Sequence, residues 1–473
     1  MVYSFRLINE QGKAVFVKFH WKPLQGLSNL LWDEAQKIQG KNIDFHRTDL
    51  YTAIEKGDYP EYELGVQIIK EEDADKHPYL LDPTKIVPES VVPVTPLGKM
   101  TLNRNVDNFF AETEQVTFCV SNVVRGIGFT NDSLLQGRLM SYVDTQLNRM
   151  NSANFMQLPI NRPVNAVHNN QRDGFMQSTI HKGDVTYYPN HLQGNAPEIA
   201  EPSQGGYMEY PEKIDGVTKI REQVPTVEDH YSHAQIYWNS LTDYEKQQTV
   251  DGLRFEVGKS IDLGVRKRMI DVLNHVDNSL ARRVAFAVNV PLPDKVADNP
   301  GHKSVGLSIE ERPHPPHIRT KTVAILTAPG TDAKDASDMY DFLKKEGAYV
   351  EYVGPALGNV DGLEITQTYT TASSVLYDAV YVPDGAEAIK KLTSKQSSFP
   401  YDEPVVFVLD AFRHCKPVGA SGAGAELLKL AKVEGGEKEG VLVGQHASAL
   451  TEGFKKALIQ QRYWARMALD PPI

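Results

Sequence analysis

Hydrophobic and polar residues alternate with two different periods in the first 70 positions. Strand-like alternation occurs in three segments: Phe5–Ile8, Ala14–Phe19 and Tyr62–Ile69. The polar run Asn9–Gly12, between the first two of these, predicts a hairpin turn. Residues 27–38 and 45–55 instead carry apolar side chains at helical spacing. The pattern predicts part of an antiparallel sheet with a helical insertion.

From about residue 88 to residue 225 this periodicity fades, and prolines recur throughout the segment. A single helical pattern stands out there, in residues 138–149. An irregular stretch of this length is uncommon inside a compact domain. Residues 226–290 become helical again, and residues 291–319 are rich in proline and charge, which is typical of a linker.

Residues 320–473 differ in kind from the rest. Lys321–Leu326 is a continuous apolar run of the type found in buried parallel strands, and Ala336–Glu346 has the spacing of a helix. Further strands are predicted at Val350–Val353, Tyr377–Pro383, Val405–Leu409 and Lys416–Val418. This alternation of strands and helices predicts a doubly wound α/β domain.

Composition narrows the class of protein. The 473 residues include 50 Lys and Arg against 61 Asp and Glu, a net charge of −11 that argues against a nucleic-acid-binding surface. No apolar run approaches the roughly 18 residues of a membrane span. With no signal-like start and no Ser-Lys-Leu ending, the expected location is the cytoplasm. The two cysteines, Cys119 and Cys415, imply neither a disulfide framework nor a zinc site.

The residues best suited to bind a cofactor or metal lie in the segment 138–149. Tyr142 lies one helical turn after Arg138 and two turns before Arg149. A free tyrosine loses its proton only near pH ~10, and an always-charged arginine one turn away favours the phenolate. A phenolate is a strong donor to ferric iron. The segment alone leaves open the alternative that Tyr142 is an ordinary half-buried tyrosine on an amphipathic helix.

The segment Arg138–Arg149 resembles the proximal haem helix of haem catalases. Further motifs follow the order and near-spacing of that family over most of residues 3–290: Phe19–Pro23, Trp32–Ala35, Asp44–Arg47, Gly57–Pro60, Asp82–Lys85, Leu102–Asn105, Asn161–Pro163, Asn170–Gly174 and Tyr188–Asn190. The resemblance implies an α+β catalase fold followed by an α/β flavodoxin-like domain. The expected parts are a partial β-barrel with a helical insertion (1–87), a wrapping arm with the proximal haem helix (88–225), a helical domain (226–290), a linker (291–319) and the α/β domain (320–473).

The resemblance also implies a function. Catalases convert hydrogen peroxide to oxygen and water with haem as cofactor, and their wrapping arms embrace neighbouring subunits of a homotetramer. By resemblance, Tyr142 is the axial metal ligand, Arg138 keeps it ionised and Arg149 is a partner for a haem propionate. Asp132 matches the acidic partner of the relay to the proximal arginine. Gln146 matches the large-subunit pattern within the proximal helix.

Catalases also use a distal histidine and asparagine, which precede the family's equivalent of the strand that begins at Tyr3. They are therefore expected upstream of Met1, and no catalytic residue is assigned within the chain. His20 lies in a strand motif and does not match the distal motif. The expectation is the C-terminal portion of a large-subunit catalase, either truncated or from an incomplete gene model. The alternative is a catalytically inactive, haem-binding or oligomer-forming pseudo-catalase.

Four positions depart from patterns known in the family. Tyr3 stands where the family commonly carries a histidine that helps to orient the proximal arginine. Cys119 stands where some large-subunit catalases carry a histidine that becomes bonded to the ligating tyrosine. Val87 and Glu89 occupy the places of a Trp and a His near the NADPH of small-subunit catalases, so no NADPH is expected.

The α/β domain resembles the class I glutamine amidotransferase fold that large-subunit catalases carry at their C-terminus. In that fold the nucleophilic cysteine sits on a tight turn after a strand of the Lys-Pro-Val type, here Lys416–Val418, and its expected place is Gly422. Cys415 precedes the strand, and Ser421 is only a remote candidate. We therefore expect a catalytically silent structural domain. A separate amidotransferase-like or small-molecule activity is the weakest alternative.

Overall fold

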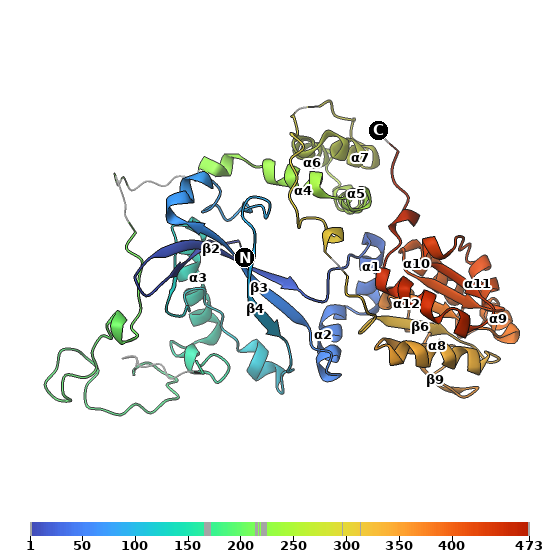
Figure 1. Ribbon diagram of the computed structural model, residues 1–473, viewed down its shortest axis with the longest axis horizontal. Helices are drawn as coiled ribbons and strands as arrows, with labels where there is room; N and C mark the ends of the chain where they lie inside the picture. Colours follow the sequence, from blue (N-terminus) through green and yellow to red (C-terminus); the bar gives the residue numbers. More distant parts are fainter. Residues whose placement is uncertain are drawn as a thin grey trace. The chain divides into compact units, whose positions relative to one another are not determined.

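The structure is a computed structural model that describes residues 2–164, 172–212, 216, 218, 225–295, 297–312 and 314–471. Met1 and the first two residues of the Asn170–Gly174 motif lie outside the described residues. The chain divides into two compact units, one up to Leu24 together with Glu61–His233 and the other formed by Gln25–Pro60 with Ala234–Ile473 (Figure 1). The helical insertion predicted within the barrel thus groups with the C-terminal part of the chain.

The first unit is built on a five-stranded antiparallel sheet. Its strands are β1 (Phe5–Ile8), β2 (Ala14–Pro23), β3 (Glu61–Lys70), β4 (Thr95–Thr101) and β5 (Ile127–Gly128), in the order β4-β3-β2-β1-β5. The three predicted strands are present, and β2 and β3 extend beyond the predicted ends. Strand β4 was not predicted, because all seven of its residues are exposed and it therefore lacks alternating burial.

Each face of this sheet carries an apolar cluster of the same unit. One face packs Tyr3, Phe5 and Val17 against Leu135 of helix α3 (Ser133–Met150). The other face forms a cluster of Phe16, Ile69, Leu80, Val87 and Val92. Because successive strand residues point to opposite faces, the alternation in the sequence sends neighbours such as Phe16 and Val17 into different clusters.

Helix α3 is the only α-helix within the described part of residues 88–225, as predicted. The carboxylate of Asp132 caps its start by accepting the amides of Leu134 and Leu135, and Asn151 ends it in the left-handed conformation at φ 58°. The unit also contains short 3₁₀ and π elements: η1 (Glu71–Lys76), the π-turn η2 (Phe110–Glu114), η3 (Phe155–Gln157), η4 (Pro202–Gln204) and η5 (Pro225–Glu228).

A buried aspartate joins two distant segments of this unit. Asp82 is 2% exposed, and its carboxylate accepts the hydroxyl of Thr226 at 2.6 Å and both the amide and the hydroxyl of Thr84 at 2.9 and 2.6 Å. Burial acts to raise its pKa, but the hydrogen bonds from Thr226 and Thr84 outweigh burial and hold that pKa at about 2.

We expect Asp82→Asn to destabilise the first unit at neutral pH but not in acid. An unfolded aspartate titrates near about 3.9, so the native carboxylate contributes about 2–3 kcal/mol above that pH and loses it as the pH falls through about 2. Denaturant unfolding at pH 7 and pH 2 measures this difference, with the exposed Asp75→Asn as the control. An equal loss at both pH values would contradict the assignment.

The second unit contains two sets of helices. The insertion supplies α1 (Trp32–Lys41) and α2 (Phe45–Glu55). The predicted helical region supplies α4 (Ser232–Ser240), α5 (Asp243–Gly258), α6 (Leu263–Val276) and α7 (Asn278–Ala287), which share a core that includes Trp238, Val250, Ile270 and Val284. The first insertion helix was predicted from residue 27 but begins only at Trp32, because Leu31 is extended at φ −67° and ψ 153°.

The C-terminal part folds as a seven-stranded sheet with helices on both faces (Figure 1). The strands are β6 (Thr322–Leu326), β7 (Tyr349–Gly354), β8 (Gly358–Val360), β9 (Leu363–Thr368), β10 (Ala379–Val382), β11 (Val418–Ser421) and β12 (Val441–Gly444). Their order is β12-β11-β10-β6-β7-β9-β8, and all neighbours are parallel except β8 and β9. The strands predicted at Lys321–Leu326, Val350–Val353 and Tyr377–Pro383 are present, whereas the strand predicted at Lys416–Val418 begins only at Val418 and runs to Ser421.

Two apolar clusters cover the two faces of this sheet. Helices α9 (Ala386–Leu392), α10 (Glu403–Arg413) and α11 (Gly424–Leu430) contribute to one cluster, and α8 (Ala333–Lys345) and α12 (Thr451–Gln460) to the other. Short turns η6 (Ile309–Glu311), η7 (Ser374–Leu376), η8 (Glu437–Glu439), η9 (Ala447–Ala449) and η10 (Trp464–Arg466) complete the unit. Within β6 alternate residues divide between the clusters, with Val323 and Ile325 on one side and Ala324 and Leu326 on the other.

One predicted strand is wrong. Val405–Leu409 lies inside helix α10, which has Pro404 in its first turn and continues to Arg413. A short apolar run has no periodicity that separates a buried strand from a buried helix. Phe407, Val408 and Ala411 are all buried, and this spacing is helical. It can be recognised only if Asp410–Arg413 is included in the same segment.

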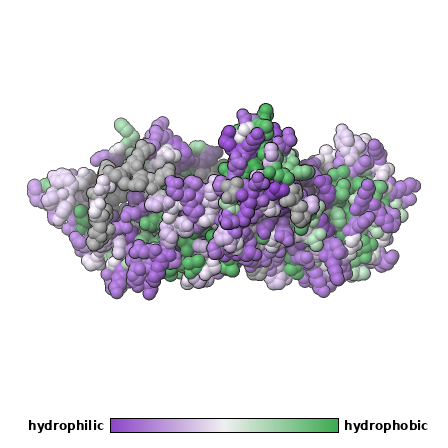
Figure 2. Space-filling view, turned by 90° about the horizontal axis from the view of Figure 1, so that it is seen from above, coloured by the Kyte–Doolittle hydropathy of each residue, from purple (hydrophilic) through white to green (hydrophobic). Residues whose placement is uncertain are grey.

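None of the helices in the described ranges is long and apolar enough to cross a membrane. Apolar residues are nevertheless visible at the surface among the hydrophilic ones (Figure 2). The most exposed include Phe175, Ile180, Ile199 and Ile261, each above 80%.

Candidate functional site

Tyr142 lies on the buried face of α3. Helical spacing places it on the side that also carries Leu135, Arg138, Gln146 and Arg149. Leu135 is fully buried against the sheet, and Gln146 is 6% exposed. Tyr142 itself is half-buried. The structure therefore brings the predicted ligand and the two predicted arginines to one face of one helix.

Arg138 lies between two tyrosines. Its guanidinium carbon is 4.7 Å from the centroid of the Tyr142 ring and 5.0 Å from that of the Tyr3 ring. The guanidinium also donates a hydrogen bond to the Tyr3 hydroxyl. A fixed positive charge this close favours the ionised form of a phenol. Tyr3 and Tyr142 thus contact the same arginine.

Asp132 is fully buried at the N-terminus of α3, directly before the site. Its Oδ1 accepts the amides of Leu134 and Leu135 at 3.0 and 2.9 Å. Its Oδ2 has no hydrogen-bond partner among the described residues. A buried carboxylate oxygen without a donor costs free energy unless a further group satisfies it. The unpaired Oδ2 of Asp132 is therefore available to accept a hydrogen bond, as the acidic relay partner predicted from the sequence would have to do.

Arg149 and Gln146 hold a neighbouring segment against α3. Arg149 donates to the carbonyl of Glu114 at 2.7 Å, to the carbonyl of Val116, and to the side chain of Gln146 at 3.0 Å. Gln146 in turn donates to the carbonyl of Phe118 at 3.1 Å. The guanidinium of Arg149 is engaged with these acceptors, so its pairing with a haem propionate stays a prediction.

The donor set fits a ferric haem. A phenol whose ring lies 4.7 Å from a permanently charged guanidinium suits a phenolate ligand, and the orphaned Asp132 Oδ2 leaves an acceptor for the relay behind it. The opposite face of α3 carries the exposed apolar side chains Met140, Val143 and Leu147. The face of Tyr142 instead pairs a half-buried phenol with a permanent positive charge.

The segment around Val87 and Glu89, where no NADPH is expected to bind, contains an ion pair. The Glu89 carboxylate contacts the Nζ of Lys22 at 2.7 Å. Beside it, the amide nitrogen of Gln67 donates to the carbonyls of Val87 and Val92 at 2.8 and 2.7 Å, and its oxygen lies 2.9 Å from Nε2 of His20. Glu89 is therefore engaged in an ion pair with Lys22. The absence of NADPH stays a prediction.

A carboxylate fills the turn after β11 at Gly422, the position predicted from the sequence for a nucleophile. Gly422 has φ +48°, and a Cβ there would lie 2.2 Å from Cγ of Asp384. Oδ1 of Asp384 accepts the amides of Ala423 at 2.8 Å and Gly385 at 2.7 Å. Asp384 thus fills the space beside Gly422 and occupies the amides of Ala423 and Gly385.

Ser421 lies in a buried polar cluster rather than at a surface. Its hydroxyl donates to Oδ2 of Asp335 and accepts from the Tyr381 hydroxyl at 2.8 Å, and it is fully buried. Oδ1 of Asp335 also accepts the Ala447 amide at 2.6 Å. Cys415 is buried before β11, and burial raises the pKa of its thiol. Neither candidate side chain can meet a substrate.

Both cysteines are free thiols, and Cys119 is half-buried with its pKa also raised by burial. Sequence reasoning missed Asp384 and Asp335, because lone aspartates after a strand or inside a helix carry no motif. It also missed the group Asp33, Asp410 and His414, the one cluster in the described ranges with spacing suited to a metal ion. The ammonium of Lys37 already lies 3.0 Å from Asp33 and 2.8 Å from Asp410, where a cation would bind.

Comparisons with known proteins cover nearly the whole chain. The catalase family model matches residues 1–194, a model described as catalase-related immune-responsive matches 225–288, and one described as the C-terminal domain found in long catalases matches 319–468. Relatives include Catalase of Alkalihalophilus pseudofirmus, 44% identical over 98% of this chain and 68% of the relative. Catalase-2 of Bacillus subtilis is 44% identical over 98% and 67%, and Catalase HPII of Pseudomonas aeruginosa is 42% identical over 100% and 67%.

Proposed function

Because the chain belongs to the catalase family, which dismutates hydrogen peroxide to oxygen and water with haem, we propose that Tyr142 is its axial haem ligand. The single observation that supports this assignment is the guanidinium of Arg138 at 4.7 Å from the Tyr142 ring. The haem supplies the redox chemistry when it is bound. Arg138 favours the phenolate, and Asp132 supplies a buried acceptor in the relay behind it.

Catalase activity is favoured over an inactive pseudo-catalase, because the similarity to catalases at 40–44% identity extends over 98–100% of the chain. Tyr3 orients Arg138 in this proposal through the hydrogen bond to its hydroxyl. We propose no residue of this chain for the distal side of the haem. Hydrogen peroxide is the substrate.

The purified protein loaded with haem should show the spectrum of a phenolate-ligated ferric haem and release oxygen from peroxide. Free haemin at the same concentration is the control, because it decomposes peroxide slowly without any protein. A spectrum like that of free haemin, with the same rate of oxygen release, would contradict the proposed function.

We further propose that residues 320–473 form a flavodoxin-like domain related to class I glutamine amidotransferases, as in large-subunit catalases. The support is the parallel sheet with helices on both faces and the match to the C-terminal domain found in long catalases. The proposal includes the absence of a nucleophile, since Gly422 occupies its turn and the Asp384 carboxylate fills the space beside it.

We expect the full chain to hydrolyse no glutamine. Asp384 blocks the turn at Gly422, and Ser421 is fully buried in hydrogen bonds. Ammonia release from glutamine can be followed with a coupled assay, using Ser421→Ala and Cys415→Ala as matched variants. Turnover in the native protein that either substitution abolishes would overturn the expectation.

A homotetramer is the proposed assembly. The described residues of the arm expose large apolar side chains, among them Phe175 at 95%, Ile180 at 92% and Ile199 at 81%. A surface of this kind is costly in water and is typical of subunit contacts. Light scattering of the purified protein tests the proposal, and a monomer of 52.8 kDa would contradict it.

A further inference from the structure

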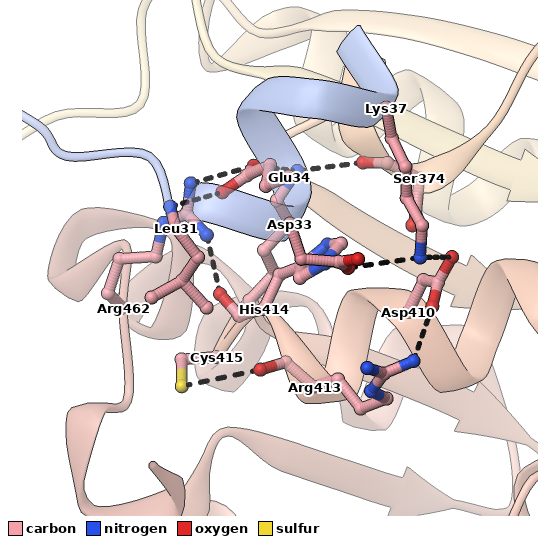
Figure 3. A network of polar contacts seen from close by, with 11 residues as sticks. Leu31, Asp33, Glu34, Lys37, Ser374, Asp410, Arg413, His414, Cys415 and Arg462 are labelled. Atoms are coloured by element: carbon pink, nitrogen blue, oxygen red, sulfur yellow. Dashed lines mark hydrogen bonds and ion pairs between the residues drawn. The ribbon is translucent and has the colours of Figure 1, made fainter. Parts of the chain in front are cut away.

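Helix α1 carries a glutamate that is completely removed from water. Glu34 is 0% exposed, although it lies in the first turn of a helix that is mostly half-buried or exposed. A carboxylate in that position is stable only if other charges and donors surround it. All of its charged partners come from the C-terminal α/β part of the same unit (Figure 3).

Two cations bind the Glu34 carboxylate. Nζ of Lys416 lies 2.7 Å from Oε1, and Nη2 of Arg462 lies 3.0 Å from the same oxygen. Lys416 is 2% exposed, and its ammonium also donates to the carbonyls of Ser374 at 2.8 Å and Tyr377 at 2.6 Å. The second carboxylate oxygen accepts the amide of Leu31 at 3.3 Å. One buried carboxylate is therefore paired with two cations, and backbone carbonyls accept the remaining hydrogen bonds of Lys416.

Neighbouring positions on α1 continue the pairing. Asp33 contacts Nε2 of His414 at 2.8 Å, and Lys37 contacts Asp410 at 2.8 Å. One turn further on, Lys41 donates to the carbonyl of Thr370 at 2.8 Å. Asp33 and Lys37 thus both meet polar side chains of the surface beneath α1, and the dashed contacts in Figure 3 mark these two pairs.

The far end of the same insertion is also held. Asp58 forms an ion pair with Arg319 at 2.8 Å and accepts the Tyr349 hydroxyl at 2.6 Å. The ammonium of Lys56 lies 3.6 Å from the centroid of the Tyr349 ring. Residues 25–60 are therefore anchored to the C-terminal part near their beginning and at their end.

The anchoring surface lies at a definite edge of the α/β sheet. Ser374 and Tyr377 precede β10, and Lys416 precedes β11, so the surface is at the amino ends of these strands. Enzymes with open α/β sheets place their ligands at the opposite edge, beyond the carboxyl ends. At that opposite edge Gly422 follows β11 and the Asp384 carboxylate fills the turn.

We propose that the C-terminal α/β domain acts as a receptor for the insertion of residues 25–60, with Glu34 as the buried group that fixes the docking register. An apolar contact tolerates sliding by a turn. A buried carboxylate does not, because every position except one leaves Glu34, Lys416 and Arg462 as unpaired buried charges. The domain thus holds the segment that links β2 to β3. It does so at the amino ends of its strands, the edge opposite to the one where enzymes with open α/β sheets bind their ligands.

Hydrogen exchange of the full chain tests this proposal. In Glu34→Gln we expect the protection of amides in α1 to fall roughly 10²-fold or more, because the substitution leaves two buried cations unpaired. Amides of β6 and β10 should keep their protection. The exposed Glu364→Gln is the matched control, and Asp33→Asn, whose side chain is 48% exposed, should lower α1 protection less than about tenfold.

The double variant Glu34→Gln with Lys416→Met separates docking from general stability. Because it removes both members of the buried pair, α1 should lose less protection than the product of the two single losses. If the Lys416→Met protein does not fold, the hydrogen exchange of Glu34→Gln alone tests the proposal. Glu34 lies in the insertion, so its substitution does not alter the core of the α/β domain. Protection of α1 in Glu34→Gln equal to that of the control would overturn the proposal. So would a loss of the same size in the core strands, because Glu34 would then stabilise the whole unit rather than its docking.

Discussion

Tyr142→Phe should abolish the phenolate-ligand spectrum of the haem-loaded protein and lower its peroxide turnover by more than about 100-fold. Phenylalanine keeps the ring on the buried face of α3 and its contact with the Arg138 guanidinium at 4.7 Å, but it has no oxygen to donate to iron. Loss of groups that only support a metal ligand already costs roughly 10–100-fold, so loss of the ligand itself should cost more. Absorption spectroscopy and oxygen evolution measure the two effects separately.

Tyr62→Phe is the matched control, because Tyr62 lies on β3 of the same unit and is also half-buried. It should keep both the spectrum and the turnover. A Tyr142→Phe protein with an unchanged spectrum would exclude Tyr142 as the ligand. A changed spectrum with full turnover would separate ligation from catalysis and leave the axial assignment intact.

Asp335→Ala should destabilise the C-terminal domain by about 3–5 kcal/mol. Its buried carboxylate accepts from the hydroxyl of Ser421 and from the amides of Asp384 at 3.1 Å and Ala447 at 2.6 Å. Removing the carboxylate leaves these buried donors without an acceptor, and each orphaned group costs about 1–3 kcal/mol. The free energy of unfolding in denaturant measures the loss.

Asp338→Ala, one turn along α8, is the control for this experiment. Asp338 forms an ion pair with Lys334, whose side chain is 80% exposed, and such surface pairs contribute less than about 1 kcal/mol. Asp335→Asn should fall between the two variants, because it keeps one acceptor oxygen. A loss below about 1 kcal/mol for Asp335→Ala would contradict a structural role for the cluster.

Helix α3 could be predicted because its signal is local. Arg138, Tyr142 and Arg149 are spaced by helical turns, so any helix brings them to one face. The predicted strands Phe5–Ile8 and Tyr62–Ile69 were found for the same reason, since alternation reports one buried face. The error at Val405–Leu409 occurred where the chain is apolar on every side and the period disappears.

Contacts between segments far apart in sequence could not be predicted. No pattern near residue 34 indicates that Glu34 meets Lys416 and Arg462, because a glutamate in the first turn of a helix is ordinarily solvated. Asp384 was missed for a similar reason. Its effect depends on the 2.2 Å between its carboxyl carbon and the place of a Cβ at Gly422, which lies 38 positions later.

The sequence by itself determined the family, the two classes of sheet and the face on which Tyr142 lies, because residue order and local periodicity specify each of them. Only the tertiary structure decided which charges are buried and what neutralises them. It showed Tyr3 at Arg138, Asp384 in the turn at Gly422, and Glu34 between Lys416 and Arg462. The physical reason is that the free energy of a buried charge depends on distances of a few ångströms, and only the folded chain sets those distances.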